Sequence, residues 1–400
     1  MRIRLSLLVL LVGACSPEPQ QATSSDAGVG EPLPFAPSGP NAAPDPSTTG
    51  PYPVGVRTIT LVDPSRMTPG HTTPRKLVCE VWYPAVEAAR GQPGVAYDLH
   101  DALPDDMKPT IPAEALGVLQ TDAVQDAEPR HDGRPFPLVI FSHGKGGIRM
   151  QSTFYTVALA SHGYVVVAPD HEGDTLPDTL REGELNINTT VDSFVDRPQD
   201  VMFLLDHFEA LPSGDFLSGL IDMDRVGVSG HSFGAITSFR AAGMDYRIKA
   251  VVAQTPAGYT LMQVDVGTPM EQWGIPLMIQ SADLDRTLPV DPHSLSTWEH
   301  MVSPRFFLRL ATGGHFTYSD LCILDVEAID AALEIDVSNV LTDGCGEENV
   351  SPEVAFPVIR HYGIGLFNTY LRDSPGTGAL LTAAEGTRLG GAEVSFIGEP

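Results

Sequence analysis

Short apolar runs separated by Pro, Gly and charged residues recur along the chain from about residue 51 onward. Such runs, bounded by turn residues, are typical of strands, whereas apolar residues spaced three and four apart predict helices. On this basis we expect strands over residues 56–62, 76–83, 137–142, 164–168, 225–229, 249–253, 276–280 and 305–310. We expect helices over residues 152–161, 197–211 and 354–371.

The order of these elements predicts the fold class. The first two strands are expected to form a hairpin or meander, and strands and helices then alternate, which predicts an α/β protein with one doubly wound, mostly parallel sheet and helices on both faces. We assign residues 51–400 to this single domain. Three polar stretches, residues 90–134, 171–196 and 319–350, interrupt the pattern. We expect them to be loop insertions over one edge of the sheet, where a lid or a substrate rim would lie.

The first residues resemble a bacterial lipoprotein signal. Met1-Arg2-Ile3-Arg4 is basic, and the apolar run that follows it is too short to span a bilayer as a stable helix. Leu11-Val12-Gly13-Ala14 then precedes Cys15, which is similar to a lipobox. This resemblance implies that residues 1–14 are removed and that Cys15 carries lipid, so that the protein is exported and anchored to the cell envelope. A plain secretory signal with an unmodified cysteine is the alternative.

Composition narrows the classes of partner. Residues 15–50 are rich in Pro, Ser, Ala, Thr and Gly and are expected to form a disordered linker. The chain is 42% hydrophobic and 19% charged, which suffices for a large core. Asp and Glu number 51 against 24 Lys and Arg, and the resulting net charge of −27 repels phosphate backbones, so nucleic acid is not an expected partner.

Three cysteines follow the lipobox. Cys322 and Cys345 flank a loop-like stretch, and we expect them to form a disulfide, which export would permit. Cys79 lies within a strand pattern and is expected to be a buried thiol. No cysteine spacing indicates zinc, and no metal or organic cofactor is expected.

The central motif is Gly230-His231-Ser232-Phe233-Gly234. It directly follows an expected strand and opens a helix-like run. A turn this tight from strand to helix requires small residues on both sides of the serine, and it exposes the serine hydroxyl at the carboxyl edge of the sheet. The sequence therefore predicts that Ser232 is a nucleophile.

A serine nucleophile needs a base and an orienting carboxylate. His315, in Thr312-Gly-Gly-His-Phe316, follows an expected strand and is the candidate base. Asp283 and Asp285 both follow the strand over 276–280 and are the candidate acids, with Asp285 preferred because its D-x-T-x-P stretch resembles the acid loop of related hydrolases. His231 is expected to point away from the serine, and His171 to cap a loop or to line a pocket rim.

Donors must also meet the negative charge that develops on a substrate carbonyl oxygen. The backbone N–H of Phe233, directly after the nucleophile, is one candidate. The glycine-rich stretch Phe141-Ser-His-Gly-Lys-Gly-Gly147 should supply the other, and the amide of Lys145 is the expected donor.

Together these motifs resemble those of a known group, the α/β-hydrolases related to platelet-activating-factor acetylhydrolase and dienelactone hydrolase. The matching stretches are Val81-Trp-Tyr-Pro84, Phe141-Ser-His-Gly144, Ala168-Pro-Asp-His171, Gly230-His-Ser-Phe-Gly234 and Gly314-His-Phe316. In the acetylhydrolase branch the acid follows the strand after the nucleophile helix, but here that place reads Val252-Ala-Gln-Thr-Pro256. This departure moves the acid to Asp285, as in bacterial polyester hydrolases, and weakens the case for acetylhydrolase specificity. Ser232 argues against the reaction of dienelactone hydrolases, which use cysteine.

The resemblance implies the α/β-hydrolase fold and a serine esterase that cleaves a small-molecule or lipid ester through an acyl-enzyme. Two alternatives remain: an acetylhydrolase-like or phospholipase-like activity on lipid esters, and a non-catalytic binding lipoprotein. Met262, Met270 and Trp273 could line an acyl pocket, although such residues are more often core.

Overall fold

The computed structural model describes residues 44–182, 187–333, 340–372 and 374–400. The expected signal peptide, the cysteine expected to carry lipid (Cys15) and most of the expected linker lie outside these residues. Residues before the expected domain boundary at residue 51 already contact the folded part. The Gly50 amide donates to Ser161 Oγ at 2.8 Å, and the Thr48 carbonyl lies 2.9 Å from His162 Nε2, so the end of the expected linker packs against the folded part.

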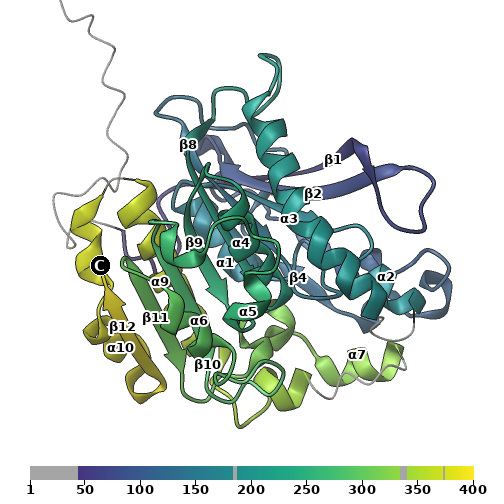
Figure 1. Ribbon diagram of the computed structural model, residues 1–400. Helices are drawn as coiled ribbons and strands as arrows, with labels where there is room; N and C mark the ends of the chain where they lie inside the picture. Colours follow the sequence, from purple (N-terminus) through teal and green to yellow (C-terminus); the bar gives the residue numbers. More distant parts are fainter. Residues whose placement is uncertain (1–43, 183–186, 334–339, 373) are drawn as a thin grey trace, which may run out of the picture.

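A ten-stranded sheet lies at the centre of the molecule (Figure 1), in the order β12-β11-β10-β9-β8-β6-β7-β2-β1-β5. The strands from β6 to β11 pair in parallel, whereas β2 pairs antiparallel with both β1 and β7, and β12 pairs antiparallel with β11. This arrangement confirms the expected doubly wound, mostly parallel sheet. The bounds of its strands are β1 Val54–Met67, β2 Pro74–Pro84, β5 Val124–Gln125, β6 Phe136–Ser142, β7 Val165–Asp170, β8 Ile221–His231, β9 Ile248–Gln254, β10 Leu277–Ala282, β11 Arg305–Leu310 and β12 Val394–Glu399.

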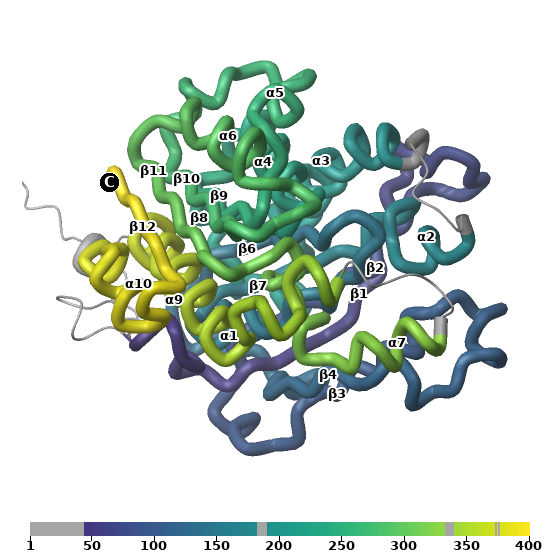
Figure 2. Tube along the Cα trace, turned by 90° about the horizontal axis from the view of Figure 1, so that it is seen from below, coloured from purple at the N-terminus to yellow at the C-terminus, as the bar shows by residue number. Residues whose placement is uncertain are grey.

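Helices cover both faces of the sheet, because the parallel strands are apolar on both sides. In β6, Val139 and Phe141 belong to the core packed under α1 and α9, whereas Leu138 and Ile140 belong to the core packed under α3 and α4. Figure 2 shows α3 and α4 on one side of the strands and α1 and α9 on the other. The helix bounds are α1 Thr153–Ser161, α3 Ile187–Glu209, α4 Phe233–Met244, α5 Tyr259–Met262, α6 Ser294–His300, α9 Pro352–Leu371 and α10 Ala383–Gly390.

The polar interruptions of the pattern form the insertions that were expected. The first contains a small antiparallel pair, β3 (Ala96–Asp98) with β4 (Val118–Gln120), and the second contains α2 (Leu176–Glu182). The third contains α7 (Val326–Leu333), which lies beside the first insertion in Figure 2. No helix among the described residues is long and apolar enough to cross a membrane.

Strand register brings the expected site residues to one edge. Ser142 at the end of β6 is opposite Gly230 of β8, His231 is opposite Gln254 of β9, and Ala282 of β10 is opposite Leu310 of β11. The loops that follow these strands therefore start from one common edge, as the carboxyl ends of parallel strands do.

Candidate active site

Ser232 occupies the turn between β8 and α4. Its backbone has φ 56° and ψ −118°, a region that a residue with a side chain rarely adopts. A Cβ at Gly230 would collide with the Gly234 carbonyl, and a Cβ at Gly234 would collide with the Ser142 carbonyl. The turn is thus as tight as the motif predicted, and the Ser232 amide is held by the Gln254 carbonyl at 2.9 Å.

Three side chains from three loops form a hydrogen-bonded chain. Ser232 Oγ lies 2.8 Å from His315 Nε2, and His315 Nδ1 lies 2.9 Å from Asp285 Oδ2. Asp285 and His315 are buried, with exposed fractions of 4% and 2%. An ionised carboxylate accepts only, so Nδ1 carries the proton and Nε2 is free to accept the serine proton.

The structure separates the two candidate acids. Asp283 pairs with Arg309 at 2.8 Å and is partly exposed, away from His315. The other oxygen of Asp285 accepts from the Leu288 amide at 2.6 Å, which orients the carboxylate. Only the preferred residue, Asp285, contacts His315.

His231 points away from the serine hydroxyl, as expected, but it has a structural partner that the sequence did not indicate. Gln151 Nε2 lies 3.0 Å from His231 Nδ1, and His231 Nε2 lies 2.8 Å from the His315 carbonyl. Burial lowers the pKa of His231 to about 3, so it is neutral and donates from Nε2. It therefore supports the backbone of the histidine loop.

Gln151 also joins the nucleophile loop to the glycine-rich stretch after β6, because its Oε1 accepts from the Gly144 amide at 2.7 Å. A Cβ at Gly144 would lie 3.6 Å from Ser232 Cβ, so this stretch passes beside the nucleophile. The amides of Lys145 and Phe233, the two expected donors, have no acceptor in the described part of the chain. The Lys145 ammonium is held by Asp174 at 2.7 Å.

A buried polar network supports this stretch from behind. Arg197 donates to the His143 carbonyl and, at 2.9 Å, to Asp174 Oδ2. His171 is fully buried here, with Nδ1 2.8 Å from Asp200, so the expectation that it caps a loop or lines a pocket rim was wrong. Burial lowers the pKa of His171 to about 4. His143 and His171 lie in quoted motifs, but no motif indicates that they join Arg197, Asp174 and Asp200, because these residues come from separate elements.

A cavity of about 370 Å³ adjoins Ser232 and His315. Its wall is mainly aliphatic, and all three insertions contribute to it: the aliphatic lining residues include Leu99, Leu116, Leu119, Leu176, Leu321, Leu324, Val326, Ile329 and Val340. Met262 and Met270 are instead buried in the core under α4, and Trp273 packs against that core.

The remaining sequence expectations concern cysteines and metals. Cys322 and Cys345 form the expected disulfide, and Cys79 is a buried free thiol. Within the described ranges no group of His, Cys, Asp and Glu is arranged to hold a metal ion.

Comparison with known proteins gives two family matches. Residues 45–179 match the family described as platelet-activating factor acetylhydrolase, isoform II, and residues 139–322 match the family described as PET hydrolase-like. The platelet-activating factor acetylhydrolase of Cavia porcellus is 24% identical over 159 residues, which is 32% of this chain and 36% of that protein. Cutinase est1 of Thermobifida alba is 26% identical over 187 residues, 46% of this chain and 55% of that protein.

The chain thus spans between about a third and a half of the length of these curated relatives. A solved structure, the ferulic acid esterase from Streptomyces cinnamoneus, covers more: it is 25% identical, with a TM-score of 0.64 over 86% of this chain and 96% of that chain. These matches confirm the resemblance that the motifs indicated. The chain has the α/β-hydrolase fold, and its sequence is similar to the acetylhydrolase family in its first half and to the PET hydrolase-like family in its middle.

Proposed function

We propose that this protein is a serine hydrolase that cleaves carboxylic esters through an acyl-enzyme on Ser232. The observation that carries the proposal is the hydrogen-bonded chain from Ser232 through His315 to Asp285, on a strained turn that opens into a cavity. The relatives' names support the same reaction class, since they include a cutinase, a bis(hydroxyethyl) terephthalate hydrolase and a ferulic acid esterase.

The geometry supports a two-step mechanism. Ser232 Oγ attacks the ester carbonyl while His315 Nε2 takes its proton, and the carbonyl oxygen becomes an oxyanion. When the tetrahedral intermediate collapses, the alcohol leaves with that proton. Water then loses a proton to the same nitrogen, attacks the acyl-enzyme and releases the acid. Asp285 keeps the imidazole in the required tautomer and stabilises the imidazolium.

Two backbone amides are the proposed donors to the oxyanion. Those of Phe233 and Lys145 have no acceptor in the described part of the chain, and the stretch that contains Lys145 passes beside Ser232. Preorganised donors of this kind lose no energy to reorientation when the charge develops. The ion pair between the Lys145 side chain and Asp174 holds this residue in place and leaves its amide free.

The aliphatic cavity indicates the class of substrate. Its volume, about 370 Å³, lies near the lower end of the range for small-molecule sites. We propose an ester with a compact, apolar acyl group. The acetylhydrolase match and the proposed membrane attachment favour a second candidate, a lipid ester. Hydrolysis of short p-nitrophenyl esters without hydrolysis of phospholipid vesicles would exclude that candidate.

We also propose that the protein is exported and attached to the cell envelope by lipid on Cys15. The lipobox-like residues before Cys15 and the Pro- and Ser-rich stretch after it support this location. Mass spectrometry of the amino-terminal peptide tests it: a diacylglyceryl cysteine is expected, and an unmodified Cys15 in the exported protein contradicts it.

The proposed nucleophile can be tested without knowledge of the natural ester. Intact-mass analysis after treatment with a fluorophosphonate probe should show one adduct on the wild type and none on Ser232→Ala. Absence of an adduct on a folded wild type would reject the enzyme and favour a non-catalytic binding lipoprotein.

A further inference from the structure

One buried carboxylate near the site has no role in the mechanism above. Asp343 lies in the short segment η9 (Leu341–Cys345), where its own backbone is not helical (φ −132°, ψ 43°), and its exposed fraction is 2%. Its Oδ1 accepts from the amides of Arg286 and His315, each at 2.9 Å. Its Oδ2 accepts from Thr287, from the amide at 2.9 Å and from the hydroxyl at 2.7 Å.

These partners belong to the two loops that carry the proposed acid and base. Arg286 and Thr287 directly follow Asp285, and His315 is the proposed base itself. A single carboxylate group thus connects the two loops. It accepts two hydrogen bonds from backbone amides of the acid loop and one from a backbone amide of the histidine loop. A buried group that joins two loops fixes the distance between them.

The partners of Asp343 are all N–H or O–H donors. An ionised carboxylate offers four acceptor positions, which matches four donors. An asparagine would place its NH₂ group against at least one of these donors and leave that donor buried without an acceptor. The site is therefore specific for the carboxylate and not only for the shape of the side chain.

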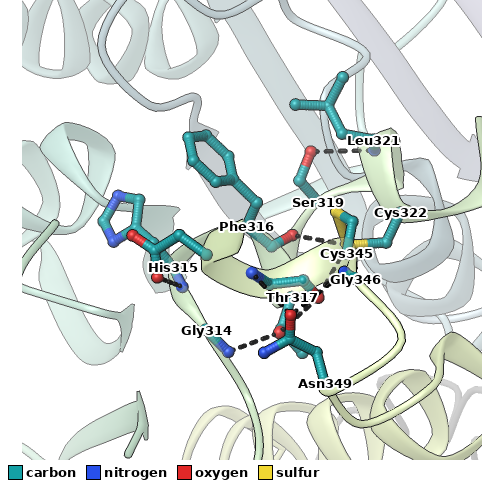
Figure 3. The surroundings of a disulfide bond; sticks show 12 residues. Gly314, His315, Phe316, Thr317, Ser319, Leu321, Cys322, Cys345, Gly346 and Asn349 are labelled. Atoms are coloured by element: carbon teal, nitrogen blue, oxygen red, sulfur yellow. Dashed lines mark hydrogen bonds between the residues drawn. A yellow bond between two sulfur atoms is a disulfide. The ribbon is translucent and has the colours of Figure 1, made fainter. Parts of the chain in front are cut away.

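The segment that carries Asp343 is itself firmly held. Gly344 has φ 143°, and a Cβ there would collide with the Thr317 and Phe316 amide nitrogens, so the segment packs against the turn after His315. Asn349 Oδ1 accepts from the Gly344 amide at 3.2 Å. The next residue, Cys345, is joined to Cys322 (Figure 3), on the side of this turn away from the His315 ring.

We infer that Asp343 is a positioning residue that holds Asp285 and His315 at hydrogen-bonding distance, anchored by the disulfide of the neighbouring Cys345. The inference rests on the proposed function, since it assigns Asp343 a role through the proposed catalytic groups. Near-attack geometry is sensitive to shifts of an ångström, so loss of this anchor should slow the chemical steps more than it weakens substrate binding.

The test compares Asp343→Asn with Glu348→Gln. Glu348 is a matched control, because it lies shortly after η9 and also contacts the acid loop, through an exposed ion pair with Arg286 at 3.0 Å. For Asp343→Asn we expect kcat for a p-nitrophenyl ester to fall roughly 10- to 100-fold, with KM changed less than about threefold. The pH below which kcat/KM decreases should also shift to a lower value in Asp343→Asn. Glu348→Gln should match the wild type in kcat, in KM and in this pH dependence.

Rates are expressed per Ser232 titrated by the fluorophosphonate. A purely structural role would lower the titratable fraction and the thermal midpoint but would leave kcat per site and the pH profile unchanged, and that result overturns the inference. A wild type without any adduct rejects the proposed function as well, which distinguishes the two failures.

If Asp343→Asn does not fold, the variants Thr287→Val and Thr287→Ser test the positioning role of Asp343 instead. Valine removes the hydroxyl that donates to Asp343, and serine keeps it. We expect kcat per titrated site to fall several-fold in Thr287→Val and to recover in Thr287→Ser. Equal kcat in both variants and the wild type contradicts the inference.

Discussion

At the scale of single residues, the neighbouring carboxylates Asp283 and Asp285 offer a matched pair. In Asp285→Asn, the amide oxygen can keep the bond from the Leu288 amide, which turns the NH₂ group toward His315 Nδ1. Nδ1 must then accept, so Nε2 carries the proton and cannot take one from Ser232. We expect kcat to fall by roughly 10⁴-fold, the loss that such a tautomer change produces in a serine triad.

Asp283→Asn is the control for that variant. Asp283 bonds to Arg309 at the surface, and exposed ion pairs of this kind contribute little. Steady-state kinetics on one ester should give a kcat within about twofold of the wild type. If Asp283→Asn shows the larger loss, the assignment of the acid is wrong.

The site roles of residues that lie in a motif could be predicted from the sequence. The roles of residues that act through contacts with distant parts of the chain could not. Ser232, His315 and Asp285 each follow a strand, and strand order alone brings them to one edge. Gln151 and Asp343 act on the backbone of other loops, and nothing in their local sequence marks them; His231 lies in the serine motif, but the motif does not indicate its bond to the His315 carbonyl. Their roles depend on how the loops pack, which strand periodicity does not describe.

At the scale of elements, the long apolar runs were predicted well and the short, half-exposed elements were missed. Every expected strand lies within the residue range of an observed strand or overlaps it. β12 was missed because only Val394 and Phe396 of its six residues are buried, a pattern that an exposed tail could also show. The pair β3 and β4 was missed because strands of three residues carry no measurable period.

The insertions also lead to a prediction about the size of the acyl group that the cavity accepts. Leu321, on the short turn η8 (Asp320–Ile323), lines the cavity, whereas Ile323 on the same turn is 54% exposed and does not. Leu321→Trp should fill part of the cavity and lower kcat/KM for p-nitrophenyl octanoate relative to acetate by about tenfold or more, the cost of losing one or two buried methylene contacts.

Ile323→Trp adds the same side chain outside the cavity and should leave the octanoate-to-acetate ratio unchanged within about twofold. Equal ratios in both tryptophan variants would mean that this cavity does not hold the acyl group.

At the scale of the whole molecule, the predicted location of the protein and its net charge are inferred from the sequence alone. The lipobox-like residues lie outside the described chain, so the lipid anchor stays a prediction. The net charge of −27 would repel the protein from an anionic membrane surface.

Buried histidines throughout the molecule predict how its stability depends on pH. Burial lowers the pKa of His162 and His171 to about 4, that of His231 to about 3, and that of His143 well below its usual value. Between about pH 4 and 6.5 the unfolded chain therefore binds protons that the folded chain does not, so the free energy of unfolding should rise with pH through this window. Asp320 acts in the opposite direction, because burial raises its pKa to about 7 and the folded state keeps a proton there.

Burial also raises the pKa of Glu80, Asp170 and Asp196, which act in the same direction as Asp320. The four histidines titrate closest to neutral pH in the unfolded chain, so near pH 6 we expect the free energy of unfolding to increase with pH, by roughly 2 kcal/mol per pH unit. Denaturant unfolding at pH 5.5, 6.0, 6.5 and 7.0 measures this slope, and Asp320→Asn should steepen it by removing the opposing proton. A free energy of unfolding that is constant or falls from pH 5.5 to 6.5 would show that these histidines are protonated in the folded protein. That outcome would remove the basis for a neutral His231 beside the loop of the proposed base His315, because burial is what lowers the pKa of His231 and of the other three histidines.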